Sequence, residues 1–282
     1  MAPPTATETV TNTVTMQAPQ SSQAAGAERT NIKMQLPSVP VFEDKVEERE
    51  YLKGRLAAAF RIFGDKGYDE GVAGHITVRD PVDPSTFWVN PFGTAFKLMK
   101  ASDLIQVDHA GKVIAGGPNR MLNAAAFMIH SAIHSARPDV NCAAHSHSLY
   151  GRAFCSLGRP LDIISQDSCA FHNGVVLAEE EGHNIAKALG NKKAALLQNH
   201  GLLTVGGTIE ETVFWFVSLE KCCHAQLMAD AAAAGRGGET VKIDEVDAAF
   251  TYKTVGTPKA GWFSAKPLFD VIHAETKGEY LE

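Results

Sequence analysis

Three histidines stand where strands are predicted to end, and their spacing indicates a metal site. His145 and His147 close one short apolar segment, and His200 closes another. Alternate residues of a strand point to the same side, so His145 and His147 can converge on one atom. Gly201 allows a sharp turn and a close backbone approach beside His200. Three imidazoles that leave one position open are typical of a catalytic metal rather than a structural one.

Imidazole nitrogen suits several divalent ions, so the residue types do not select one. We expect one ion per subunit, Zn²⁺ or Fe²⁺, with Co²⁺, Ni²⁺ or Mn²⁺ as further possibilities. A single histidine would more often be a packing or surface residue. The pair at one strand end, joined by a third at another, favours the metal site.

The composition is that of a globular protein and excludes several classes of function. Of the 282 residues, 45% are hydrophobic and 21% are charged, and the net charge is -6 with no long basic run. We therefore expect neither a nucleic-acid nor a membrane partner. The five cysteines are odd in number and irregular in spacing, and no secretory signal is visible. These features predict a cytoplasmic protein.

Helical and strand patterns alternate along the chain and predict one α/β domain. Residues 1–40 are rich in Thr, Ala, Gln, Ser and Pro and are interpreted as a disordered leader. The domain is predicted over 41–235, with hairpin-paired strands, a mostly antiparallel sheet and helices on both faces. A C-terminal tail over 236–282 is expected to dock on the domain or on a neighbouring subunit, through apolar anchors that include Trp262 and Phe269.

Two short strings resemble the class II aldolase/adducin superfamily. Residues 143–148 read Ala-Ala-His-Ser-His-Ser, after an Arg-Pro-Asp at 137–139, and residues 198–203 read Gln-Asn-His-Gly-Leu-Leu. The resemblance runs from about Glu48 to Leu227. It implies a single α/β/α-layered domain with a mostly antiparallel central sheet, in a homo-oligomer that is usually a tetramer with its active site near a subunit interface.

The resemblance also implies the metal ligands and exposes a departure. His145, His147 and His200 match the family's metal motif. In the sugar-phosphate aldolases a catalytic glutamate sits four residues before a helical histidine, and the corresponding positions here are Ala126 and His130. The usual proton shuttle is therefore missing. We expect Ala126→Glu to lower native activity and to tighten metal binding.

Other local strings are similar to one branch of the superfamily. These are the segments 74–81, 88–93 and 166–171, and His75 stands where the aldolases commonly carry asparagine. They resemble the aldolase-like non-haem iron oxygenases/decarboxylases of aminocoumarin biosynthesis. That branch implies aryl α-keto acid substrates.

Three further histidines are candidates for catalysis. His130 and His134 are four residues apart on the predicted helix and share one face, as i and i+4 neighbours do. Either is interpreted as a partner of the metal site or a proton shuttle, and His75 is a third candidate base. Arg79, together with His75, is predicted to bind a substrate carboxylate, with a surface salt bridge as its alternative.

The remaining substrate-binding candidates lie in turns and loops. Asn90 and Gly93 belong to a turn whose backbone N–H groups would bind an anion. Gln166, Asp167 and His172 follow the strand of the paired histidines. They are expected to reach the site of a neighbouring subunit.

Three functions remain open from the sequence. The first is a metal-dependent lyase that cleaves a carbon–carbon bond of a small hydroxy- or keto-acid, by aldol-type cleavage or decarboxylation. The second is an Fe(II)/O₂-dependent oxygenase or oxidative decarboxylase, which does not need the missing glutamate. The third is a non-catalytic, adducin-like interaction protein, against which the intact histidines argue.

Overall fold

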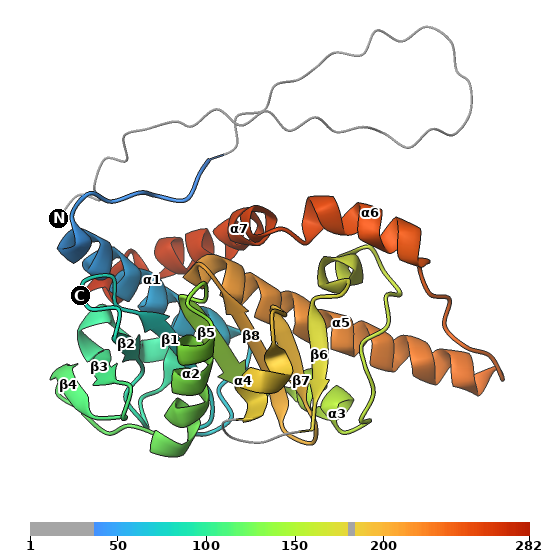
Figure 1. Ribbon diagram of the computed structural model, residues 1–282, viewed down its shortest axis with the longest axis horizontal. Helices are drawn as coiled ribbons and strands as arrows, with labels where there is room; N and C mark the ends of the chain where they lie inside the picture. Colours follow the sequence, from blue (N-terminus) through green and yellow to red (C-terminus); the bar gives the residue numbers. More distant parts are fainter. Residues whose placement is uncertain (1–36, 180–183) are drawn as a thin grey trace, which may run out of the picture. The chain divides into compact units, whose positions relative to one another are not determined.

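The computed structural model describes residues 37–179 and 184–282 (Figure 1). The chain divides after Glu43 into two units, and the second covers Asp44–Glu282. Residues 37–43 of the first unit contain no helix or strand. The predicted leader over 1–40 falls mostly outside the described residues.

An eight-stranded sheet forms the centre of the second unit, in the order β4-β3-β2-β1-β5-β8-β7-β6. Only β6 and β7 pair in parallel, and every other neighbouring pair is antiparallel. This confirms the predicted α/β fold with a mostly antiparallel sheet. The strands are β1 (His75–Arg79), β2 (Thr86–Val89), β3 (Ile105–Asp108), β4 (Val113–Gly116), β5 (Cys142–Ser146), β6 (Val175–Ala178), β7 (Ala194–Leu197) and β8 (Gly201–Gly206).

Seven α-helices of the described residues surround the sheet. They are α1 (Lys45–Asp65), α2 (Ala124–Ala136), α3 (Leu149–Cys155), α4 (Asn184–Leu189), α5 (Ile209–Gly235), α6 (Glu245–Val255) and α7 (Pro258–Thr276). The long helix α5 has a capped start, because the Thr208 side chain accepts from the Glu211 backbone N–H. None of the described helices has the length and apolar character of a membrane span.

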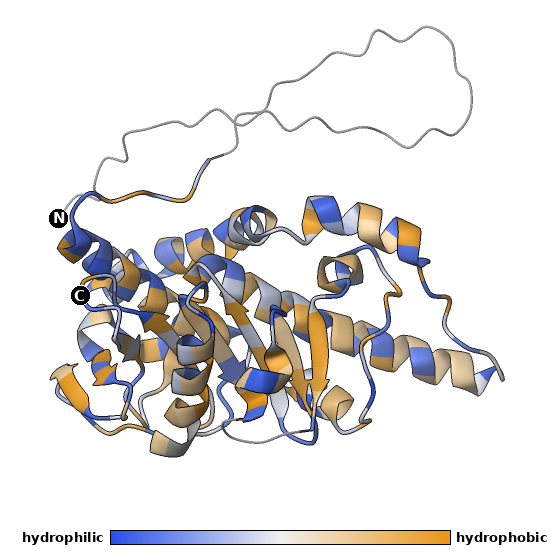
Figure 2. Cartoon of the chain, in the orientation of Figure 1, coloured by the Kyte–Doolittle hydropathy of each residue, from blue (hydrophilic) through white to orange (hydrophobic). Residues whose placement is uncertain are grey.

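Apolar clusters pack on both faces of the sheet. Cys142 and Ala144 of β5 belong to the core that contains α1, α5 and α7 residues. Ala143, between them, belongs to the core with α2 and α4 residues. This alternation follows from the two-residue period of a strand and creates three layers, helices on both faces of one sheet. In Figure 2 the strands β6 and β7 carry mainly apolar residues, whereas α6 carries both kinds.

The same alternation decides where the polar residues of β1 lie. Ile76 and Val78 pack in the α1/α5 core. His75, Thr77 and Arg79 therefore lie on the opposite face, toward α2. The polar residues of this strand thus share one side of the sheet with the face of α2 that carries histidines.

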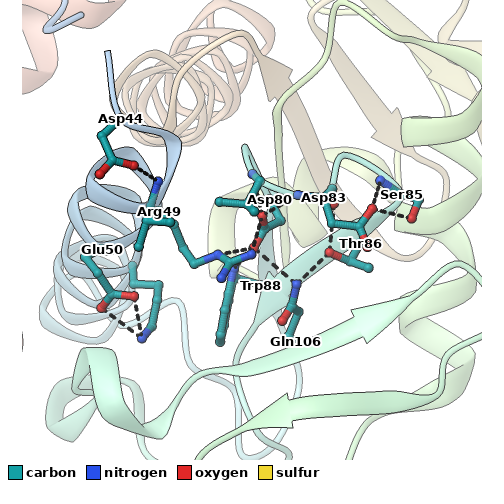
Figure 3. A network of polar contacts seen from close by, with 12 residues as sticks. Asp44, Arg49, Glu50, Asp80, Asp83, Ser85, Thr86, Trp88 and Gln106 are labelled. Carbon is teal, nitrogen blue, oxygen red and sulfur yellow. Dashed lines mark hydrogen bonds and ion pairs between the residues drawn. The ribbon is translucent and has the colours of Figure 1, made fainter. Parts of the chain in front are cut away.

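The end of β1 is joined to α1 by a buried carboxylate (Figure 3). Asp80, fully buried, accepts from Arg49 at 2.7 and 3.0 Å, from Trp88 Nε1 at 2.6 Å and from Gln106 Nε2 at 3.2 Å. The backbone N–H groups of residues 82 and 83 add bonds of 2.7 and 2.8 Å. Burial alone would raise the pKa of Asp80, but these hydrogen bonds outweigh it and lower the pKa.

Residues 236–282, predicted as a docked tail, continue the same unit as α6, α7 and a final 3-10 turn. Helix α7 packs against α1 and α5. Its Phe269 is buried, whereas Phe263 is 36% exposed. The tail is thus anchored by α7, and contact with a neighbouring subunit stays a prediction.

Candidate metal centre

Three histidine side chains converge at one end of the central strands. The ligand atoms of His145, His147 and His200 all lie within 4.8 Å of one another. Their ring centroids are 4.8 to 5.1 Å apart, and the ring planes are close to perpendicular. His145 is buried, and the other two are half-buried. The arrangement is a triangle of imidazoles with one side toward solvent.

Adjacent strands position these side chains. His145 lies in β5 and pairs with Leu203 of β8 on one side. His200 directly precedes β8, in a turn where Asn199 has a φ of 55°. A Cβ at Gly201 would come 2.6 Å from the Ser146 carbonyl oxygen, so only glycine lets β8 begin this close to β5.

The donor set fits a divalent ion. His145 Nδ1 lies 2.9 Å from the Leu202 carbonyl oxygen, which can only accept, so Nδ1 carries the hydrogen and Nε2 presents its lone pair. Burial, followed by the neighbouring histidines, lowers the pKa of His145 well below its usual value, and burial also lowers that of His147. A neutral imidazole with an unprotonated ring nitrogen is the form that binds a metal.

A buried glutamate holds the segment that follows His147. Glu220 of α5 accepts from Ser148 Oγ at 2.5 Å and from the backbone N–H groups of Tyr150 and Gly151 at 2.9 and 2.7 Å. It therefore satisfies the N-terminal N–H groups of α3 and fixes where that helix begins. The position of His147 is thus tied to α5.

A second row of histidines lies beside the cluster, on the α2 face of β1. His75 faces His145 across the β1–β5 ladder, with ring centroids 5.4 Å apart. The His75 and His130 ring centroids are 4.7 Å apart. Thr77 Oγ1 lies 2.8 Å from both His130 Nδ1 and His134 Nε2. The three predicted catalytic histidines are thus brought together, with Thr77 as their link.

Arg79 is placed away from this cluster, at the other end of β1. Its guanidinium donates to the backbone carbonyls of Pro84, His134 and Val140 at 3.1, 2.8 and 3.2 Å. No salt bridge of Arg79 is present among the described residues, and contact with a substrate carboxylate stays a prediction. The arginine ties the end of α2 to the sheet.

The other predicted substrate residues lie in two regions, one beside His75 and one around the 3-10 helix Asp167–Phe171. Asn90 is buried and lines a small cavity with His75, and Gly93 lies in the exposed turn after it. Gln166 and Asp167 are exposed beside the 3-10 helix Asp167–Phe171, and His172 Nε2 lies 3.3 Å from a Glu245 carboxylate oxygen. Within this chain the last three do not meet the histidine triangle, and their approach to a neighbouring subunit stays a prediction.

Ala126 falls within α2, but its side chain lies outside the described part of the structure. Sequence reasoning missed Thr77, Glu220 and Arg152. Thr77 was detectable from its place between His75 and Arg79 on an alternating strand. Arg152, ion-paired with Glu70 at 3.0 Å, acts on the cluster, because its charge lowers the pKa of His147 further after burial and His200.

Comparison with known proteins agrees with this architecture. The family model described as "Class II Aldolase and Adducin N-terminal domain" matches residues 54–227. Two Streptomyces proteins are each 43% identical over 245 residues, covering 83% of this chain. One, from S. roseochromogenus, is named 4-hydroxy-3-prenylphenylpyruvate oxygenase/4-hydroxy-3-prenylbenzoate synthase, and the other, from S. niveus, is Decarboxylase NovR; 86% and 88% of their lengths are covered.

A solved structure is also similar over most of its length. It is described as L-fuculose 1-phosphate aldolase from Glaciozyma antarctica PI12 and is 56% identical, with a TM-score of 0.83 and coverage of 86% of this chain and 96% of that one. The family match covers more than half of this chain and includes all three clustered histidines. The chain therefore belongs to the class II aldolase and adducin family.

Proposed function

We propose that this protein is a divalent-metal-dependent lyase that cleaves a carbon–carbon bond of a small hydroxy- or keto-acid, by aldol-type cleavage or decarboxylation. The observation that carries the proposal is the triangle of His145, His147 and His200, which no Asp or Glu of the described residues joins. Three neutral ligands leave the full charge of the ion. A bound Zn²⁺ or Fe²⁺ would polarise a carbonyl oxygen and stabilise the negative charge that forms when the bond breaks.

The chain's own residues would hold the ion and handle protons. Glu220 and Ser148 fix the backbone after His147, and the Leu202 carbonyl fixes the ring of His145. His75, His130 and His134 are proposed as the acid/base group in place of the glutamate absent at position 126. Of these, His75 and His130 are nearest to the triangle, since Thr77 separates His134 from it.

The relatives support an enzyme of this kind. The Glaciozyma structure is described as an aldolase and one Streptomyces relative as a decarboxylase. Both reactions break a bond next to a carbon that must carry negative charge. Intact metal-binding histidines separate the proposal from a non-catalytic, adducin-like role, which remains the least favoured alternative.

A second candidate is an Fe(II)/O₂-dependent oxygenase or oxidative decarboxylase of an aryl keto- or hydroxy-acid. The name of the other Streptomyces relative, an oxygenase of an arylpyruvate, favours it. Three histidines on one side of an ion leave positions for both a keto acid and O₂. This chemistry does not require a carboxylate at position 126.

Metal content and oxygen consumption distinguish these candidates. Protein purified without oxygen should contain one ion per chain by mass spectrometry, and His145→Ala should lose it while remaining folded by circular dichroism. With a panel of aryl and aliphatic keto- and hydroxy-acids, a lyase releases product without O₂. An oxygenase consumes O₂ in step with product. A His145→Ala variant that keeps its metal would reject the proposed centre.

The panel also tests the departure at Ala126. We expect Ala126→Glu to lower turnover of the best substrate and to tighten metal binding, because the added carboxylate would compete as a ligand and repel an acid substrate. A general acid/base contributes about 10²–10⁴-fold, so a change of either sign is measurable. A rise in turnover would instead support the usual aldolase route.

We further propose a cytoplasmic homotetramer with the site near a subunit interface. The family resemblance and the exposed apolar residues of the tail, such as Phe250 and Phe263, support assembly. Light scattering at micromolar concentration should give a mass about four times that of the chain. A monomer would reject this part of the proposal and leave the metal site untouched.

A further inference from the structure

Helix α3 joins the segments that carry two of the three clustered histidines. It begins at Leu149, two residues after His147, and ends at Cys155. Glu220 fixes its start through the first backbone N–H groups of the helix. The other end of the helix is hydrogen-bonded to the turn that carries His200. One short helix thus contacts two candidate ligand segments that are more than fifty positions apart in the sequence.

Cys155 forms hydrogen bonds with both neighbours of His200. Its Sγ donates to the Gly201 carbonyl oxygen at 3.3 Å. Its own carbonyl oxygen accepts from the Asn199 backbone N–H, also at 3.3 Å. The backbone on either side of the histidine is therefore held by one residue of α3.

The turn before β8 is a segment for which such support matters. Asn199 has a φ of 55°, in the left-handed region that favours glycine. A residue other than glycine keeps this conformation only when the surrounding structure holds it. Gln198 and Asn199 are exposed, and His200 is half-buried, so solvent rather than packing surrounds much of the turn. The hydrogen bonds to Cys155 are contacts that hold it against the buried end of α3.

The middle of α3 reaches the support of the third histidine. A Cβ at Gly151 would come 2.4 Å from Leu202 Cγ, so the helix backbone packs directly on Leu202. The carbonyl oxygen of Leu202 is the acceptor that fixes the ring of His145. All three ligand segments are therefore in contact with α3 or with a residue that packs on it.

The chemistry of Cys155 suits a structural donor and not a ligand. Its side chain is 0% exposed, and its sulfur is not one of the ligand atoms that converge in the triangle. Burial raises the pKa of Cys155 to about 12, so the group keeps its hydrogen at neutral pH and can donate it. Cys223 of α5 is equally buried and has no hydrogen bond to the 198–201 turn among the described residues, which makes it a matched control.

We propose that Cys155 is a positioning residue for the metal centre: its thiol and its carbonyl, at the end of α3, hold His200 where it can share one ion with His147. This inference rests on the metal centre of the proposed function and is independent of the reaction. The thiol hydrogen bond should therefore contribute to metal affinity, whereas the same deletion at Cys223 should affect stability alone.

The zinc affinity of the full-length protein, measured by competition with a chromogenic chelator, tests the proposal. Cys155→Ala should raise the Kd for zinc about 10–100-fold, the range typical of residues that orient metal ligands. Cys155→Ser keeps a donor, and its Kd should lie closer to that of wild type. Cys223→Ala should lower the melting temperature and leave the Kd unchanged. An unchanged Kd in folded Cys155→Ala, or an equal rise in Cys223→Ala, would overturn the proposal.

Cobalt substitution separates positioning from ligation. The visible absorption bands of bound Co²⁺ depend on the geometry of its ligands, so they should change in Cys155→Ala and keep the wild-type form in Cys155→Ser and Cys223→Ala. An intense sulfur-to-cobalt charge-transfer band that Cys155→Ala abolishes would identify the thiol as a ligand and refute the positioning role. Wild type that binds neither metal would reject the metal centre itself, which is a different result from a wild-type centre that Cys155→Ala leaves intact.

Discussion

The two ends of strand β1 hold buried polar clusters of opposite character. At one end Asp80 accepts from Arg49, Trp88, Gln106 and two backbone N–H groups (Figure 3). At the other end, the acceptors of His75 and its neighbours have no partner among the described residues. A buried polar network stabilises a fold when all of its groups have hydrogen-bond partners. Buried polar groups without partners reduce stability, and they are typical of sites where a ligand supplies the missing bonds. A structural cluster at Asp80 and a candidate functional cluster at His75 are thus only five positions apart in the sequence.

The largest expected effect is at the satisfied end. Asp80→Asn removes the charge opposite Arg49 and replaces an acceptor of several bonds with an amide. Breaking such a buried pair costs about 3–5 kcal/mol in the free energy of unfolding. Urea unfolding measures the loss, with Asp83→Asn as the control, because the Asp83 side chain bonds only to exposed Ser85. If Asp80→Asn and Asp83→Asn lost equal free energy of unfolding, the buried network of Asp80 would not have the stabilising role assigned to it.

Acid should act on the histidine end first. Burial, followed by the charge of Arg79, lowers the pKa of His134 from 6.5 to about 3, so below pH 6.5 the unfolded chain binds a proton that the folded chain refuses. Stability is therefore lost as the pH falls from 6.5 toward 3, about 2 kcal/mol by pH 5 from this residue alone. Asp80, whose pKa is lowered, loses its contribution only below its ordinary value of 3.8.

Unfolding of the metal-free protein at pH 7, 6 and 5 measures this loss. The His134→Phe variant should show a shallower decline, because one proton-binding difference is removed. Asp80→Asn should keep the wild-type slope over this range. A flat wild-type profile would contradict the assignment of neutral, buried histidines.

Arg79 is expected to behave as a structural residue. Arg79→Lys retains the charge but cannot reach three carbonyls in the guanidinium geometry, and unpaired buried acceptors cost about 1–3 kcal/mol. We expect a lower melting temperature and an unchanged KM for the best acid substrate. A large rise in KM without loss of stability would instead support the predicted contact with a substrate carboxylate.

The smallest stability effect is expected at the unsatisfied end. His75→Phe removes a buried acceptor that has no partner and fills similar volume, so the free energy of unfolding should change by less than about 1 kcal/mol. Turnover of the best substrate should nevertheless fall strongly. If His75→Phe lost both stability and activity, the role of His75 would be to stabilise the fold, as Asp80 does.

The sequence predicted the parts of the molecule that local periodicity encodes. The pair His145 and His147 and the antiparallel hairpins both follow from short-range patterns. Thr77 links His130 and His134 only because α2 packs on β1 in one particular rotation. That packing is a long-range feature, which local sequence patterns do not encode. The bonds of Glu220 to α3 likewise join segments far apart in the chain.

The sheet order has a kinetic consequence. β1 lies next to β5, and β5 next to β8, so the histidine triangle forms only after long loops have closed. Loop closure of this kind dominates the folding barrier of sheet proteins. The ion should therefore bind after the rate-limiting step: zinc added during refolding would slow unfolding and leave the folding rate unchanged.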